Sequence, residues 1–335
     1  MSHPIRRFYK RSPRLRRLVR QAKNALIAGV TNSALWLVGL LSLEQALWLG
    51  EGIGALLYPC LRSTRRLALE HLHLAFGDAL TPAAREDLAR AALINVARTF
   101  CEVAKIDVIR ARRDEYIEFV GSENLTAMLA EGKGTIAITG HIGNWELLAA
   151  YFAWTDVPVT AIARRIYADK LNQLLVDYRR RQGVETILRE SPSSGREIIR
   201  ALRRKGILAM LIDQDTHVPS VSVPFFGRQA RTPAGAALLA IRREIPVFAA
   251  FIQRRPQGGH RITIQPAISR PSSDDVANVR ALTQAFNAAL EAQIRSNPAE
   301  WVWWHRRWRR TPIAHLDLDE GFQYENADTV LRGRG

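Results

Sequence analysis

Residues 134–148 read GTIAITGHIGNWELL, and this stretch decides the fold that we expect. A short apolar run, 135–139, ends at Gly140 and His141, and a helical pattern follows at once. A strand that turns directly into a helix is the repeating unit of a parallel α/β sheet. Gly140 and Gly143 permit a sharp turn and a close approach of the backbone. His141 is therefore predicted to lie at the carboxyl end of a strand, where ligands bind in such sheets.

The same alternation continues on both sides of this stretch. The predicted strands are 135–139, 157–163, 207–213, 246–252 and 261–266, and the predicted helices are 144–154, 169–182, 195–204, 233–243 and 274–294. This order favours an α/β domain over 116–312, with a mainly parallel sheet flanked by helices. Residues 61–115 read as helical because apolar residues recur at helical spacing. The polar tail, 313–335, is expected to be disordered.

The amino-terminal region combines charge with hydrophobicity. Residues 1–23 form a basic arm with nine Lys or Arg and no acid, and 24–60 are hydrophobic. The uncharged part, 24–43, is just long enough to cross a bilayer core of about 30 Å. Basic residues on both sides favour a helix or hairpin lying in the membrane interface over a single span. The alternative is a buried helix of a soluble protein, which would give the basic arm no role. We expect an anchor at the cytoplasmic face of the cell inner membrane.

The formal charge of +16 predicts an anionic partner: nucleic acid, an anionic membrane surface or a phosphorylated substrate. Residues 301–310, WVWWHRRWRR, mix aromatic and cationic side chains as nucleic-acid-binding segments do. They also end the α/β domain directly after a helix, so we favour packing in the core or at a membrane interface. We predict no nucleic-acid partner. Cys60 and Cys101 are too few and too isolated for a disulfide framework or a zinc site.

His141 and Glu146 are the candidate catalytic pair. Glu146 falls in the first turn of the helix, from where its side chain can fold back towards the imidazole. A carboxylate on one ring nitrogen fixes the tautomer and leaves the other nitrogen free to take a proton from a hydroxyl. Backbone N–H groups at the helix start could steady an oxyanion. His71 and His73 lie two residues apart and therefore face different sides of a helix. We expect both to be interfacial or solvated, and not a metal pair.

Several blocks, in order, resemble the lipid A biosynthesis (late) acyltransferases, the lauroyl/myristoyl transferases of Gram-negative bacteria. They are GHIGNWE at 140–146, AR at 163–164, LIDQD at 211–215, VPFFG at 223–227, ARTP at 230–233 and WWHRRW at 303–308. The resemblance extends over about residues 20–312. It implies a fold like that of glycerolipid acyltransferases, with an amino-terminal helical membrane anchor. Because both His141 and Glu146 are present, an inactive scaffold is disfavoured.

The resemblance implies roles for particular residues. His141 would be the general base and Glu146 its partner. Arg164 would bind phosphate or the phosphopantetheine of the acyl donor, and Arg179 or Arg181 would do likewise.

Further implied positions follow the predicted strand 207–213. Asp213 and Gln214 end this strand and would line the cleft of His141 as substrate-binding residues. Asp215 is either a turn residue or a functional one. Phe225 and Phe226 would form the wall of an acyl groove or part of the core.

The resemblance also implies substrates and partners. The donor would be acyl carrier protein, an acidic protein that surface arginines would attract, with acyl-CoA left open. The acceptor would be a hydroxyl of a lipid A precursor or a related glycolipid, at an anionic lipid surface. Phosphatidylinositol mannoside and lysophospholipid are alternative acceptors. No metal or redox cofactor is needed. The sequence contains no G-x-S-x-G motif, so it does not suggest a covalent acyl-enzyme.

Overall fold

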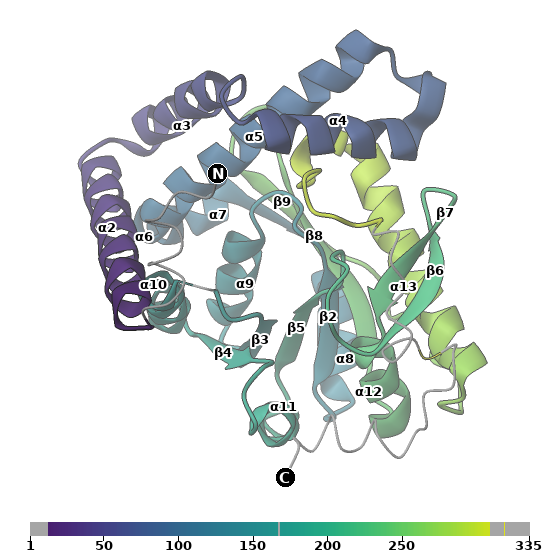
Figure 1. Ribbon diagram of the computed structural model, residues 1–335. Coiled ribbons are helices and arrows are strands. Elements are labelled where there is room, and N and C mark those ends of the chain that lie inside the picture. Colours follow the sequence, from purple (N-terminus) through teal and green to yellow (C-terminus); the bar gives the residue numbers. More distant parts are fainter. Residues whose placement is uncertain (1–12, 167, 309–317, 319–335) are drawn as a thin grey trace.

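A computed structural model of the chain describes residues 13–166, 168–308 and 318 (Figure 1). The first part of the predicted basic arm and, apart from Leu318, the predicted tail lie outside the described residues. The helices described are α2 (Pro13–Gly39), α3 (Leu43–Leu57), α4 (Arg62–Phe76), η1 (Gly77–Ala79), α5 (Pro82–Ala104), α6 (Ile106–Ala111), α7 (Arg113–Tyr116), α8 (Ser122–Ala130), α9 (Trp145–Ala153), α10 (Asp169–Arg181), α11 (Ser194–Arg203), α12 (Gly235–Arg243), α13 (Val276–Ser296) and η2 (Pro298–Glu300).

The strands form one large sheet and one hairpin. They are β1 (Ile117–Val120), β2 (Thr135–Thr139), β3 (Val159–Ala163), β4 (Val184–Leu188), β5 (Ile207–Leu211), β6 (Ser220–Phe225), β7 (Arg228–Pro233), β8 (Val247–Arg254) and β9 (His260–Ile264). The sheet has seven strands in the order β1-β9-β8-β2-β5-β3-β4. Every neighbouring pair is parallel except β8 and β9. The predicted mainly parallel α/β sheet is confirmed, and β2, which leads to His141, lies at its centre.

Side chains of the central strands alternate between two helical layers. Ile136 and Ile138 of β2 pack in one cluster with α12 and α13, whereas Ala137 packs in another with α8 and α9. Figure 1 shows α9 and α10 on one side of the sheet and α12 and α13 on the other. All five residues of β2 are buried because both faces are covered. The continuous apolar runs of the sequence follow from this burial.

The antiparallel hairpin β6–β7 was not expected from the sequence. Its two-residue turn is Phe226-Gly227, and both residues have positive φ, 53° and 69°. Such a turn matches the twist of a hairpin and tolerates glycine better than phenylalanine. Phe225 and Phe226 are buried in the core, which is one of the two positions that the resemblance implied for them. The Phe-Phe-Gly block therefore serves a turn as well as packing.

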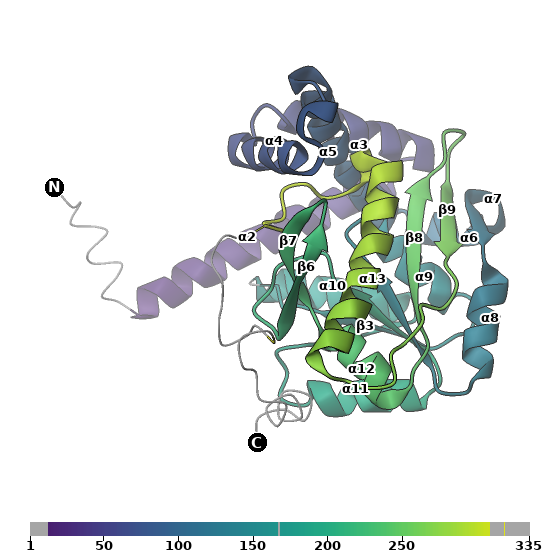
Figure 2. The same ribbon diagram turned by 90° about the vertical axis from the view of Figure 1, so that its right-hand side faces the viewer.

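The first two helices are joined by a short turn at 40–42 and carry an exposed apolar surface. One stripe of α3 is buried, mainly against α5: Leu43, Ala46, Gly50 and Gly54. The remaining sides of α3, the adjoining end of α2 and the start of α4 expose large apolar side chains, among them Val30, Trp36, Leu37, Leu40, Trp48, Ile53, Leu56, Leu57 and Leu61. We call this set the apolar patch. Figure 2 shows α2 projecting beyond the α/β body.

In the described part of the chain, no helix combines the length and the apolar character needed to cross a bilayer. The predicted amino-terminal anchor stays a prediction.

Candidate active site

The loop after β2 brings His141 to the carboxyl edge of the sheet. Gly143, at φ 58°, makes the turn, and a Cβ on it would lie 2.1 Å from the carbonyl oxygen of Ile252. Glycine is therefore required by both the backbone conformation and the close approach. Asn144 caps α9, because its side-chain oxygen accepts a hydrogen bond from the N–H of Leu147 at 3.0 Å. The turn that the two glycines predicted is present, with His141 at the edge of the sheet.

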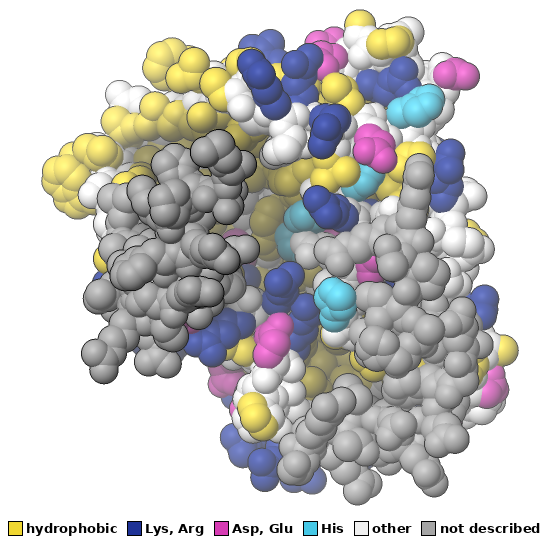
Figure 3. Space-filling model, in the orientation of Figure 1, with side chains coloured by type: hydrophobic (Ala, Val, Ile, Leu, Met, Phe, Trp, Pro, Cys, Tyr) yellow, Lys and Arg dark blue, Asp and Glu magenta, His cyan; other side chains and the backbone are white. Residues whose placement is uncertain are grey.

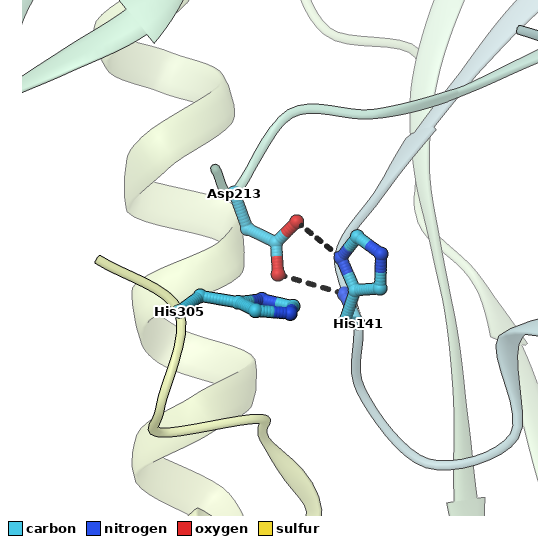
Figure 4. Close-up of side chains that lie close together, drawn as sticks. All are labelled: His141, Asp213 and His305. Atoms are coloured by element: carbon cyan, nitrogen blue, oxygen red, sulfur yellow. Dashed lines mark hydrogen bonds and ion pairs between the residues drawn. The ribbon is translucent and has the colours of Figure 1, made fainter. Parts of the chain in front are cut away.

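The carboxylate that binds the His141 ring belongs to Asp213 (Figure 4). Strand β5 pairs with β2, so the residues that follow the two strands meet. The His141 Nδ1–H donates to Asp213 Oδ1 at 2.9 Å, and the His141 backbone N–H donates to Oδ2 at 2.8 Å. Trp301 Nε1–H donates to the same Oδ2 at 2.9 Å. A Cβ on Gly140 would lie 3.1 Å from this oxygen, so glycine admits the carboxylate.

Asp213 is fully buried, and its charge is held by these donors. Burial alone raises the pKa of the Asp213 carboxyl, but the charge and hydrogen bonds of His141 outweigh burial and hold that pKa well below its usual range. An ionised partner on Nδ1 fixes the tautomer, so Nε2 of His141 carries the lone pair and can accept a proton. The structure therefore has an imidazole at the strand end with a carboxylate on one ring nitrogen.

Glu146 was expected to be that carboxylate, and this expectation is wrong. Glu146 lies in the first turn of α9, but its carboxylate accepts two hydrogen bonds from Arg179, at 2.6 and 2.9 Å. The pair is largely buried, with side-chain exposures of 9% for Glu146 and 14% for Arg179. Among the described residues, no hydrogen bond joins Glu146 to His141. Because Arg179 lies in the last turn of α10, the pair ties two helices together beside the site.

Among the remaining predicted residues, Gln214 lies beside His141 and two arginines are exposed. Gln214 lies at His141: its amide nitrogen is 3.2 Å from Nε2 and 3.3 Å from Nδ1. An atom so nearly equidistant from both ring nitrogens does not lie along the lone pair of either. Arg164 follows β3 and is exposed, as is Arg181. Asp215 is buried and pairs with Arg231 at 3.4 Å, which favours its structural interpretation.

His305 was missed as a site residue. Its ring lies 4.6 Å from that of His141, centroid to centroid and nearly perpendicular, and Gln214 Nε2 lies 3.1 Å from both its nitrogens. In the sequence His305 stands among the aromatic and cationic side chains of WWHRRW, and no spacing there marks it as a site residue. In the same segment Trp301 and Trp303 are fully buried, so the expected core packing is confirmed and their faces cannot stack on nucleic-acid bases.

The sequence also did not predict a buried polar cluster around Glu102, which contacts the loop that carries His141. Glu102, on α5, accepts from Arg254 at 2.6 Å, from His260 at 2.8 Å and from the side-chain amide of Asn144 at 2.8 Å. Burial raises the pKa of Glu102, but His260 and Arg254 outweigh it and hold that pKa far below its usual range. Since Asn144 also caps α9, this charged cluster supports the loop that carries His141. Only the fold brings these distant residues together.

His141, Asp213 and His305 together offer donor atoms within 4.8 Å of one another, a set that could hold a metal ion by residue type. In the present arrangement both Asp213 oxygens already accept N–H groups, and Nδ1 of His141 is turned to one of them. We therefore interpret the set as an acid–base site.

The expectation for His71 is wrong. His71 is buried and its Nδ1–H donates to the carbonyl oxygen of Trp303 at 2.7 Å, whereas His73 is exposed as expected. His71 thus serves packing of the tryptophan segment.

Comparison with known proteins identifies the family of the chain. Residues 13–310 match the family model described as bacterial lipid A biosynthesis acyltransferase. The chain is similar to the phosphatidylinositol mannoside acyltransferases of Mycolicibacterium smegmatis (28% identity; 67% of this chain and 73% of the relative) and Mycobacterium tuberculosis H37Rv (29%; 68% and 72%). It is also similar to the lipid A biosynthesis lauroyltransferase of Escherichia coli K12 (25%; 83% and 90%).

Among solved structures, the 1-acyl-sn-glycerophosphate acyltransferase of Thermotoga maritima aligns with 75% of this chain and 98% of its own, at 11% identity and a TM-score of 0.32. That score is too low to support an argument. The match to the family model spans most of the chain, including the His141 loop, the Asp213 turn and the tryptophan segment. The chain therefore belongs to the bacterial lipid A biosynthesis acyltransferase family and is an acyltransferase.

Proposed function

We propose that the chain transfers a fatty acyl group from the thioester of acyl carrier protein to a hydroxyl of a lipid A precursor or related glycolipid. His141 is the general base, oriented by Asp213. The observation that carries this proposal is the Nδ1–H···Asp213 bond, which presents Nε2 to an incoming hydroxyl. General-base assistance of this kind contributes about 10²–10⁴ in rate.

The proton transfers of the reaction need no group beyond these side chains. The acceptor hydroxyl attacks the thioester carbonyl carbon, its proton passes to Nε2 of His141, and a C–O bond forms. The tetrahedral intermediate then collapses, the C–S bond breaks, and the thiolate takes the proton back from His141. Asp213 stabilises the imidazolium that forms between these two steps.

Exposed arginines support an acidic donor protein. Arg196, Arg200 and Arg203 recur at helical spacing on the exposed side of α11, and Arg164 is exposed at the carboxyl edge of the sheet. An acidic carrier approaching such a surface associates faster, and the effect falls with added salt. Acyl-CoA is the alternative donor, because its phosphates would be attracted by the same charges.

The acceptor has two candidates, each favoured by a relative. The mannoside acyltransferases match at 28–29% identity, whereas the lauroyltransferase match covers more of both chains. Figure 3 shows a hollow near the middle of one face, with hydrophobic and histidine side chains inside it and Lys or Arg side chains beside it. A basic rim around an apolar interior suits a phosphorylated glycolipid with acyl chains.

The apolar patch supports a location at the membrane. Trp48 and Leu56, one helical stripe on α3, are 78% and 73% exposed. Figure 3 shows hydrophobic side chains gathered over α3, with Lys and Arg side chains beside them over α4. An exposed apolar surface next to cations fits the interface of an anionic bilayer, in line with the proposed cytoplasmic face of the inner membrane.

The test is an acyl-transfer assay with purified full chain in detergent micelles. Lauroyl-acyl carrier protein and lauroyl-CoA are each offered with a tetraacylated lipid A precursor, with a phosphatidylinositol mannoside or with no acceptor, and the lipids are analysed by mass spectrometry. We expect one added lauroyl group on one glycolipid, made faster by the carrier-protein donor. If wild type acylates neither glycolipid from either donor, the proposal is wrong; transfer to the mannoside alone selects the second acceptor.

A further inference from the structure

A proton acceptor alone does not complete an acyl-transfer site, because the carbonyl oxygen of the thioester becomes an oxyanion. Preorganised N–H donors usually stabilise this charge, and removing one typically costs about 10²–10³ in rate. Backbone N–H groups beside the nucleophile are a common source of such donors. The loop that carries His141 contains such N–H groups.

The first three N–H groups of this loop are already used inside the protein. The N–H of His141 donates to Asp213, that of Ile142 donates to the carbonyl oxygen of Gly140 at 2.8 Å, and that of Gly143 donates to the carbonyl oxygen of Glu300 at 3.0 Å. None of the three can turn to a substrate without losing its present partner. These three groups therefore do not serve an oxyanion next to His141.

Figure 4 shows His305 beside Asp213, with its ring next to that of His141. The two rings are 4.6 Å apart between centroids and meet at 82°. Neighbouring groups of one bound substrate can therefore contact both rings at hydrogen-bond distance. Gln214, which touches both rings, spaces them.

The backbone on both sides of His305 is fixed. Before it, the N–H of Val302 donates to the carbonyl oxygen of His141 at 3.2 Å, and Trp301 bonds Asp213. After it, the fully buried Arg307 donates to the carbonyl oxygen of Arg231 at 2.6 Å. A donor held in this way needs little reorganisation when charge develops, which is the property that makes such groups effective.

The charge state of His305 suits a hydrogen-bond donor. Burial, followed by the nearby His141, lowers the pKa of His305 to about 4, although Asp213 opposes this shift. At neutral pH the ring is therefore neutral and carries one N–H. A neutral imidazole can polarise a carbonyl without exchanging a proton with the base beside it.

We propose that His305 is a second catalytic residue, which donates an N–H hydrogen bond to the thioester oxygen as that oxygen becomes an oxyanion. The proton of the acceptor hydroxyl still passes to His141, and His305 neither gains nor loses one. When the C–S bond breaks, the carbonyl reforms and the hydrogen bond weakens. This inference rests on the proposed acyl-transfer function.

The test compares His305→Gln with His305→Met, two side chains of similar length of which only Gln has an N–H. Both full-length variants are assayed for lauroyl transfer from lauroyl-acyl carrier protein, beside wild type, His141→Ala and the control His73→Phe on the exposed side of α4. Affinity for a non-reactive thioether analogue of the donor is measured in parallel. Because this analogue has no carbonyl, its binding reports structure and not oxyanion stabilisation.

We expect kcat of His305→Met to fall by about 10²–10³, with KM and analogue affinity unchanged, and His305→Gln to recover part of the loss. His73→Phe should match wild type. Equal rates for Gln and Met, or loss of analogue affinity in step with kcat, overturn the inference. If either variant does not fold, His305→Ala with added imidazole decides, since restored turnover is required. Failure of wild type itself to transfer would instead reject the proposed function.

Discussion

His305 couples the charge of the site to folding, because its pKa of about 4 lies below the value of about 6.5 for an unfolded histidine. As pH falls, His305 therefore takes up a proton at a higher pH in the unfolded chain than in the folded one. The stability that His305 contributes is fully present above pH 6.5 and is lost as pH falls towards 4.

We therefore predict that wild type loses more stability than His305→Gln when pH is lowered from 7 to 4.5. Denaturant unfolding of both proteins at a series of pH values measures the difference. The contribution of Glu102, whose pKa shift does not involve His305, is common to both proteins and cancels. Parallel curves for the two proteins would contradict the burial of a neutral ring.

Glu146 and Arg179 form a largely buried ion pair, and breaking such a pair leaves one charge uncompensated. We predict that Glu146→Gln destabilises the protein by about 3 kcal/mol, whereas the double variant Glu146→Met, Arg179→Met recovers most of the loss. Denaturant unfolding measures both. If the double variant is as unstable as the single one, the charge argument is wrong.

At this scale the sequence predicted the place of His141 at the sheet edge and assigned the wrong carboxylate to its ring. His141 and Glu146 are five residues apart, and proximity in sequence made the pairing attractive. Asp213 lies 72 residues from His141, and only the pairing of β2 with β5 brings them together. That pairing is a long-range property which spacing within one segment does not contain. The resemblance placed Asp213 at the cleft but as a substrate-binding residue.

Helix α3 contains two glycines, Gly52 and Gly54, that have different surroundings. A Cβ on Gly54 would lie 2.6 Å from the Cα of Ile94 on α5, whereas a Cβ on Gly52 would meet nothing within 4 Å. We predict that Gly54→Ala destabilises the protein by about 1–3 kcal/mol through overpacking. Gly52→Ala, the matched control, should stabilise the helix by about 0.5–1 kcal/mol. Thermal unfolding of both variants checks this, and a neutral Gly54→Ala would show that α3 does not pack on α5 as described.

Elements with strong periodicity were predictable and short irregular ones were not. The strands β2, β3, β5, β8 and β9 and the helices α9 to α13 fall where apolar runs and helical patterns lie. The edge strands β1 and β4 and the hairpin β6–β7 were missed. Strand β4 is interrupted by Glu185, and strand β6 contains Pro224. Neither strand therefore shows the continuous apolar run of a central strand.

Across the whole molecule, large exposed apolar side chains gather mainly on the amino-terminal helices, beside the basic surface of α4. Deleting residues 1–60 would remove α3 from α5 and expose a buried face, so surface substitutions test the anchor more cleanly. We predict that Trp48→Glu with Leu56→Glu sharply reduces co-flotation with anionic liposomes, without loss of stability. Val120→Glu, at an exposed apolar position on β1 outside the apolar patch, is the control. Undiminished flotation of the double variant would contradict docking through this patch.

The central claim is that Asp213, and not Glu146, orients the base His141. Its most direct test is the pH–rate profile of acyl transfer for wild type, Asp213→Asn and Glu146→Gln. We predict that Asp213→Asn lowers the rate by about 10²–10⁴ and moves the acid limb of the profile, because the partner of the imidazolium is lost. In folded Glu146→Gln the acid limb should keep its position even if the rate falls. A moved limb in Glu146→Gln with an unmoved one in Asp213→Asn would contradict the account.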